Sequence, residues 1–255
     1  MPLNIRPPRR GRWTALLMSL LSIASFAAHA DTVASLLGNF TINQYCGLKI
    51  SGDALALHYV VVYGQLPALR ELHAADAGGN GVTSQTERDD YLGRLAPTMA
   101  DQFTLTIDGA VVPLHATRWS STLPTEQGGF SLRVDVDFAA RLPARVKTRH
   151  SLQFANDNYA GRLGWHEIVV EPSSGIAVFD TNAFGSSMTG ALSEALQSLP
   201  EAGPLDERAV HLNYVQGSAP PGPSCWRRDR RRACRSKRRV VRRTRQSRIC
   251  PTAHG

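Results

Sequence analysis

Alternating apolar and polar residues run through most of residues 31–217 and predict a chain built mainly from β-strands. The alternation is clearest over residues 54–62, 103–107 and 130–138. Similar shorter runs predict further strands at residues 111–117, 150–154, 165–170 and 175–179. Short strands separated by turn residues favour an antiparallel β-sandwich over a βαβ fold, which needs a helix between each pair of parallel strands.

Turn and helix signals divide these strands. Asp108-Gly109 predicts a tight hairpin, because both residue types tolerate positive φ. The strand pattern is interrupted at residues 65–73 and 84–100, where we expect a helical insertion, with a break at Pro97 in the second helix. The predicted fold class is therefore mostly β, with a helical insertion and a disordered basic tail at residues 218–255.

Residues 1–30 have the order of a secretory signal peptide. Four arginines come first, then an apolar run at residues 13–24, then small residues up to Ala28-His29-Ala30. We expect cleavage after Ala30 and an exported, periplasmic or extracytoplasmic product that begins at Asp31. The alternative is an uncleaved anchor helix, but polar residues interrupt the run before it reaches the ~20 apolar residues of a membrane span.

The net charge of +8 comes from the two ends of the chain. Residues 1–30 carry +4 and residues 225–255 carry +12, so residues 31–224 carry +8 − 4 − 12 = −8. This distribution argues against nucleic acid as a partner of the core, in spite of the basic pI.

Residues 76–87, between the two expected helices, align with the twelve-residue calcium loop of an EF-hand. Gly81 stands at the sharp turn. The candidate metal ligands are Asp76, Asn80, the carbonyl of Val82, Ser84 and Glu87. These residues occupy positions 1, 5, 7, 9 and 12 of the loop, which are ligand positions in an EF-hand, and the last of them is a glutamate. Calcium takes six to eight oxygen ligands. Calcium is therefore the candidate cofactor.

The loop is degenerate in two places. Position 3 is Gly78, which offers no side-chain oxygen, and position 8 is Thr83 instead of an aliphatic residue. With only two formal negative charges, we expect calcium affinity on the order of millimolar. The alternative is a helix–loop–helix that has kept the turn and lost the ion.

The core shows no motif of an enzyme. Its histidines stand singly, without H-x-H or H-E-x-x-H spacing, and G-x-S-x-G is absent. Asp135 with Asp137 fits the wet face of a strand, and His166 and Glu167 should point to opposite faces. We expect the lone core cysteine, Cys46, to be a small buried hydrophobe. The sequence thus predicts a non-catalytic protein.

Several phrases, taken in order, resemble a known family. They lie at residues 37–45, 57–61, 76–87, 154–169 and 204–206. Together they are similar to the extracytoplasmic N-terminal domain that precedes the membrane part of bacterial nickel/cobalt-exporter-like permeases. The resemblance covers residues 35–217. The most specific phrases are G-N-F-T-I-N at residues 38–43 and N-D-N-Y-A-G-R-L-G-W-H-E-I at residues 156–168.

The resemblance implies a non-catalytic accessory domain of a nickel or cobalt efflux permease. In that family the loop reads D-x-D-G-D-G, whereas this chain has Gly78 and Asn80 at two of the acidic positions. The family then continues into hydrophobic spans that carry the transport residues, and this chain enters an arginine-rich stretch instead. The expectation is therefore a truncated member without transport activity of its own, whose partner would be a membrane permease part encoded downstream.

Residues 218–255 leave three interpretations open. They hold thirteen basic residues behind a Pro220-Pro221-Gly222-Pro223 run, a composition typical of disorder. The segment is a shifted reading frame, an arm that binds polyanions or anionic lipid, or a linker without a function of its own. The second interpretation leads to the alternative function, a free-standing secreted binding protein with a weak calcium loop.

Overall fold

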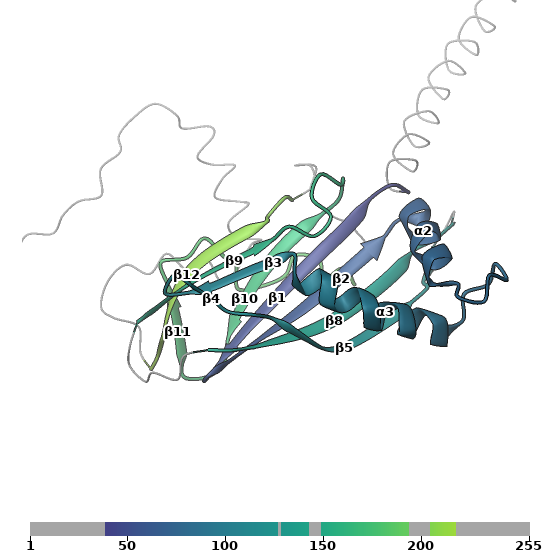
Figure 1. Cartoon of the computed structure of the whole chain (residues 1–255). Helices are drawn as coiled ribbons and strands as arrows, with labels where there is room; N and C mark the ends of the chain where they lie inside the picture. Colours follow the sequence, from purple (N-terminus) through teal and green to yellow (C-terminus); the bar gives the residue numbers. More distant parts are fainter. Residues whose placement is uncertain (1–38, 127–128, 143–148, 194–204, 218–255) are drawn as a thin grey trace, which may run out of the picture.

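The strands expected from the alternating pattern form two stacked sheets. The computed structural model describes residues 39–126, 129–142, 149–193 and 205–217 (Figure 1). The expected signal peptide and basic tail lie outside these residues. No helix in the described part of the chain is long and apolar enough to span a membrane.

The first sheet has five strands in the order β10-β1-β2-β8-β5. Their bounds are His166–Pro172 for β10, Ile42–Ser51 for β1, Ala54–Tyr63 for β2, Leu132–Arg141 for β8 and His115–Thr122 for β5. The second sheet has the order β11-β12-β9-β3-β4. Its bounds are Ile176–Phe179 for β11, Ala209–Gln216 for β12, His150–Asn156 for β9, Phe103–Ile107 for β3 and Ala110–Val111 for β4. Thr125–Glu126 (β6) and Gly129–Phe130 (β7) form a separate small pair.

The mostly β sandwich is confirmed, with one difference in strand direction. Most neighbouring strands are antiparallel, but β1 pairs with β10 in parallel, Gln44 opposite His166. The sequence pattern did not predict β1 or β12. In β1 the polar Asn43 and Gln44 are buried, so the apolar alternation that marks a half-exposed strand is missing.

Aromatic side chains join the two sheets across the core. Phe103 of β3 meets Tyr59 of β2 edge-on at 5.1 Å between ring centroids, and Phe138 of β8 at 5.3 Å. Cys46 is buried beside them, as expected, and is a free thiol within the described part of the chain. Burial raises the pKa of this thiol, so Cys46 contributes as an apolar group.

The helical insertion consists of α2 (Gln65–Ala75) and α3 (Gln85–Ala100), which lie against one end of the first sheet (Figure 1). The expected break at Pro97 is wrong, because α3 continues through it. Pro97 sits in the last turn, where its missing N–H removes only the ladder bond to Gly93. The Asp108-Gly109 hairpin is confirmed, with φ of 53° and 84° between β3 and β4.

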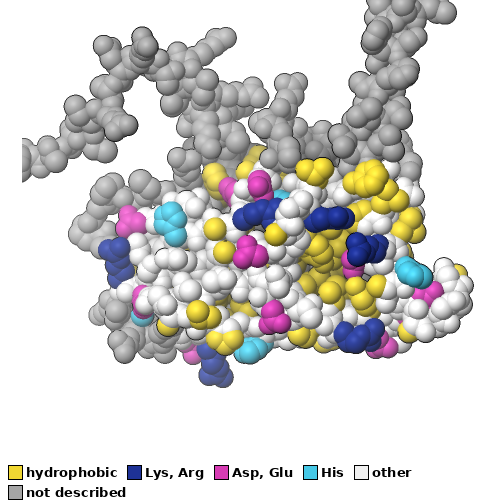
Figure 2. Space-filling model, turned by 45° about the horizontal axis from the view of Figure 1, so that its top comes forward, with side chains coloured by type: hydrophobic (Ala, Val, Ile, Leu, Met, Phe, Trp, Pro, Cys, Tyr) yellow, Lys and Arg dark blue, Asp and Glu magenta, His cyan; other side chains and the backbone are white. Residues whose placement is uncertain are grey.

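Several large apolar side chains stay on the surface. They are Phe40, Leu66, Leu69, Val82, Val111, Trp119, Leu123 and Leu163. Figure 2 shows hydrophobic side chains gathered over the end of the molecule that carries α2, with basic side chains among them. Elsewhere on that face, acidic and basic side chains are interspersed.

Candidate functional site

The calcium-like loop joins α2 to α3 in the register that an EF-hand requires. Helix α2 ends at Ala75, and Asp76 follows as its C-cap. Helix α3 begins at Gln85, the tenth position of the loop. Glu87, the twelfth position, therefore stands in the first turn of the exit helix, from which its carboxylate can reach back into the loop.

Two glycines make the turn. Gly79 has a φ of 64° and Gly81 a φ of 79°, values that residues other than glycine seldom adopt. The Oδ1 atom of Asn80 accepts a hydrogen bond of 2.8 Å from the Val82 amide. This local bond holds the middle of the loop in a bend, with Asn80 at the fifth position.

Asp76 points into the loop from the end of α2. Its Oδ2 accepts from the Gly81 amide at 2.8 Å, and its Oδ1 accepts from the Asn80 amide at 3.3 Å. A carboxylate has about four lone-pair sites, so both oxygens retain sites for a cation. The amides therefore orient the carboxylate without using up its capacity to accept.

Glu87 points into the loop from the start of α3. Its Oε1 accepts from the Gly78 amide at 3.0 Å, and its Oε2 accepts from the amide and hydroxyl of Ser84 at 2.9 and 2.8 Å. Ser84 Oγ in turn accepts from the Glu87 amide, which completes a capping box. The bonds from Ser84, followed by the one from Gly78, lower the pKa of Glu87, so its carboxylate is charged at neutral pH.

The two carboxylates converge on the empty third position. A Cβ built on Gly78 would lie 3.3 Å from Glu87 Oε1 and 3.9 Å from Asp76 Oδ1. The structure thus brings together the first and last of the predicted ligands around the place where the third ligand is missing. That arrangement suits a small hard cation, which needs several oxygens around one point.

Arg88 fixes the far side of the loop to the sheet. Its guanidinium donates to the Thr83 carbonyl at 2.7 Å and to Ser121 Oγ of β5 at 3.2 Å. The Thr83 hydroxyl donates to the Leu72 carbonyl of α2 at 2.9 Å. The loop is therefore pre-organised, but the nearby positive charge of Arg88 also lowers its attraction for a cation.

The described residues, the loop included, hold no group of three or more His, Cys, Asp or Glu side chains suited to a metal ion; the loop itself offers two such side chains, Asp76 and Glu87. The densest ionic cluster joins His58 to Asp137 at 2.7 Å and to Asp135 at 3.5 Å. Arg118 and Arg133 pair with the same carboxylates at 2.6 and 2.9 Å. The carboxylates are thus already neutralised. Sequence reasoning missed this cluster because the partners come from three strands.

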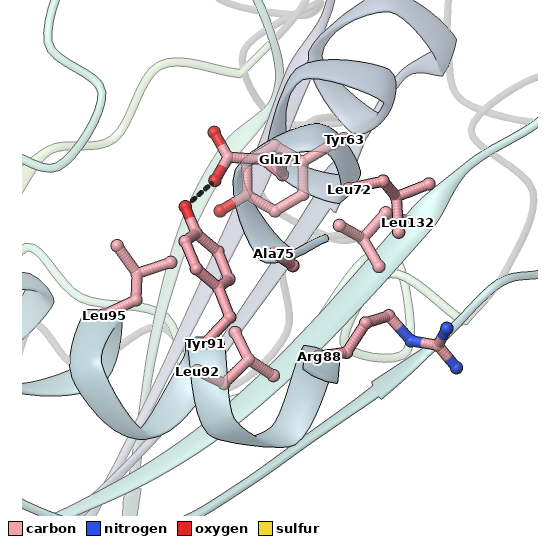
Figure 3. Close-up of a pocket in the computed structure, with 9 residues that line it drawn as sticks. All are labelled: Tyr63, Glu71, Leu72, Ala75, Arg88, Tyr91, Leu92, Leu95 and Leu132. Carbon is pink, nitrogen blue, oxygen red and sulfur yellow. Dashed lines mark hydrogen bonds between the residues drawn. The ribbon is translucent and has the colours of Figure 1, made fainter. Parts of the chain in front are cut away.

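The small cavity between α2 and α3 has no room for a substrate (Figure 3). Its volume is about 10 Å³, enough for one water molecule. It is lined by Tyr63, Glu71, Leu72, Ala75, Arg88, Tyr91, Leu92, Leu95 and Leu132. Tyr91 donates to Glu71 across it at 2.6 Å, which ties the two helices together.

A buried polar network lies where β1 meets β9 and the loop that follows β9. Gln44 Oε1 accepts from Tyr59 at 2.6 Å and from Asn156 at 2.9 Å, and Gln44 Nε2 donates to the Asn158 carbonyl at 3.1 Å. Asn156 also donates to Cys46 Sγ at 3.5 Å. These side chains satisfy one another, so they join the two sheets at a place that hydrophobic packing alone would not specify.

Glu167 and His166 point to opposite faces of β10, as expected. The carboxylate of Glu167 is 1% exposed and accepts from the Met188 amide at 2.6 Å and the Thr189 hydroxyl at 2.7 Å. His166 faces Asp206 and Arg208 on the other side. Glu167 therefore fastens the segment around residues 187–192 to the outside of the first sheet.

The comparisons with known proteins leave the site to be judged by its geometry. No family model matches the chain, and no curated protein matches it.

Proposed function

We propose that this chain is a non-catalytic, extracytoplasmic binding domain whose helix–loop–helix binds calcium weakly through residues 76–87. The observation that supports this proposal is the convergence of Asp76 and Glu87, from the ends of two helices, on the space beside Gly78. Their hydrogen bonds come from the loop itself, so the carboxylates are oriented before the ion arrives.

The affinity follows from the number of ligands. Asp76, Asn80, Ser84, Glu87 and the Val82 carbonyl offer about five or six oxygens, and water completes a shell of six to eight. Two carboxylates and a neighbouring arginine give little net negative charge. We therefore expect a dissociation constant on the order of millimolar, the range of extracellular calcium modules.

Binding would stabilise the fold by linking α2 to α3. A cation held by Asp76 and Glu87 joins the last turn of one helix to the first turn of the next. At a free calcium concentration of about ten times Kd, preferential binding to the folded state contributes about 1.4 kcal/mol. For a domain of this size that raises Tm by roughly 3–6 °C.

The test compares melting curves of the full-length protein with and without calcium. The wild type should melt at a higher temperature in CaCl₂ at about ten times the expected Kd than in NaCl of the same ionic strength. Glu87→Gln should abolish the calcium effect, because it removes the charge and the bidentate carboxylate while keeping a residue that fits the capping box. Glu171→Gln, on an exposed part of β10, serves as the control and should respond like the wild type. Equal calcium responses in all three proteins would overturn the proposal.

A second candidate function comes from the family resemblance, an accessory role beside a nickel/cobalt efflux permease. The observation in its favour is that the two most specific phrases meet in space. The Ile42 amide donates to the Leu163 carbonyl at 2.8 Å, and the Trp165 amide donates to Asn43 Oδ1 at 2.9 Å. The two phrases that carry the resemblance thus belong to one structural junction.

The accessory role is tested in the DNA that follows this reading frame. A hydrophobic multi-span frame directly downstream, whose product co-purifies with this chain, would support a permease partner. If no such frame follows, the free-standing binding protein is favoured.

A further inference from the structure

Four exposed apolar side chains surround the point where the chain enters the sandwich. Phe40 is 50% exposed, Leu66 46%, Leu69 47% and Leu163 66%. We call these four residues the entry patch. Side chains of this size are normally spread singly over a surface, so their grouping at one end calls for an explanation.

Backbone hydrogen bonds hold the three segments of the entry patch together. The Leu66 amide donates to the Asn39 carbonyl at 3.0 Å, which places the start of α2 beside Phe40. The Ile42 amide donates to the Leu163 carbonyl at 2.8 Å, which brings in the loop before β10. Leu66 and Leu69 are three residues apart in α2 and therefore share its outer face.

Exposed arginines lie next to the apolar side chains. Arg70 follows Leu69 in α2, and Arg162 precedes Leu163 in the loop. Figure 2 shows this mixture of hydrophobic and basic side chains over the end that carries α2. Apolar groups flanked by arginines are the combination that binds the boundary between lipid headgroups and acyl chains.

We propose that the entry patch rests on the surface of an anionic phospholipid bilayer. The four apolar side chains insert at the headgroup level, and Arg70 and Arg162 contact lipid phosphates. A second copy of the chain fits less well, because four apolar side chains are far fewer than the roughly 20–30 residues that each partner contributes to a stable interface. This inference does not depend on calcium binding.

The test is flotation of the full-length chain with vesicles of phosphatidylethanolamine and phosphatidylglycerol. The patch variant is Phe40→Ser/Leu66→Ser/Leu69→Ser. The control is Val111→Ser/Leu123→Ser, which removes exposed apolar groups outside the entry patch. All proteins keep the same ends, so any binding by the basic tail is common to them, and high salt weakens it.

At high salt, the bound fraction of the patch variant should fall several-fold below that of the wild type, while the control variant stays near the wild type. Arg70→Glu/Arg162→Glu should lower binding to these vesicles but not to vesicles of phosphatidylcholine alone.

Equal flotation of the patch and control variants would overturn the proposal. So would a wild type that elutes as a dimer and a patch variant that elutes as a monomer, because the patch would then be a subunit interface. Unchanged melting temperatures of the variants show that the fold is intact.

Discussion

Gln44 is the side chain on which the buried polar network depends. It accepts from Tyr59 and Asn156 and donates to the Asn158 carbonyl, and it is 1% exposed. Removing Gln44 leaves several buried partners without a hydrogen bond at once. Removing one partner leaves Gln44 hydrogen-bonded to the others. The cost of a substitution should therefore depend on its place in the network.

Gln44→Ala should lower the free energy of unfolding by about 3–5 kcal/mol, because it leaves a cavity and buried polar groups without partners. Tyr59→Phe should cost only about 1 kcal/mol, since Asn156 still donates to Gln44 Oε1. Urea unfolding of both variants measures the difference. Equal losses would mean that the network does not act as a unit.

Two histidines should respond to pH with opposite signs. Asp135 first, and Asp137 as well, raise the pKa of His58 by hydrogen bonding, against the effect of burial. Its stabilisation is fully present below the unfolded pKa of about 6.5 and is lost as pH rises through the higher folded pKa. Burial first, then Arg208, lowers the pKa of His166. The folded state keeps His166 neutral, so stability falls as pH drops below about 6.5.

We therefore expect His58→Gln to lower Tm more at a pH of about 5.5 than at about 8. His166→Gln should instead be relatively more stable, compared with the wild type, at the lower pH. Melting curves at both pH values give the comparison. Parallel pH responses of the two variants would contradict the assigned environments.

At the residue scale the sequence predicted the turn between α2 and α3, because the spacing of its residues is local; that residues 76–87 hold an ion stays a prediction. Asp76 and Glu87 are only eleven positions apart, and the turn between them is set by neighbouring glycines. The network around Gln44 could not be predicted, since Gln44 and Asn156 are far apart in sequence and both resemble ordinary surface residues. Their burial is decided by tertiary packing.

Among the elements, the junction between β1 and the loop before β10 is the tightest. A Cβ on Gly164 would lie 2.0 Å from the Ile42 carbonyl oxygen, a backbone atom that cannot move without breaking the strand pairing. This close approach lets the Ile42 and Gln44 amides bond to the Leu163 and Trp165 carbonyls, continuous with the parallel pairing of β1 and β10. Glycine is required there by contact, and its φ of 158° also disfavours a side chain.

Gly164→Ala should therefore prevent stable folding, or cost more than ~3 kcal/mol if the chain folds. Gly175→Ala is the matched control. Its Cβ would meet nothing within 4 Å, and only its φ of 82° opposes the change, at about 1 kcal/mol. Soluble yield and urea unfolding of the two variants measure the effect. A Gly164→Ala protein as stable as Gly175→Ala would contradict the junction described above.

Elements with plain alternation, such as β2, β3 and β8, were predicted closely, as were both helices. β1 was not, because its inner face carries Gln44 and its outer face is also buried. Nor was its parallel pairing with β10, since local pattern does not determine which edge strand a distant segment joins.

For the whole molecule, the mostly β sandwich followed from strand number and spacing. The leader and the basic tail stay predictions, because residues 1–38 and 218–255 lie outside the described part of the structure. So do export, the calcium site and any permease partner.

Deleting residues 218–255 should leave Tm unchanged within about 1–2 °C, since a segment with thirteen basic residues and one acid buries little apolar surface. Differential scanning calorimetry of the shortened and full-length chains checks this. A fall of several degrees would show that the tail contributes to the fold.

The most direct test of the calcium site restores its missing ligand. Gly78→Asp places a third carboxylate beside Glu87 and Asp76, so without calcium the variant should be less stable than the wild type through like-charge repulsion. Gly78→Asn adds the oxygen without the charge and serves as the control. In millimolar calcium, Tm of Gly78→Asp should rise by several degrees more than that of the wild type, with Gly78→Asn in between. If millimolar calcium leaves the melting curve of Gly78→Asp unmoved, residues 76–87 are a structural turn and not a calcium site.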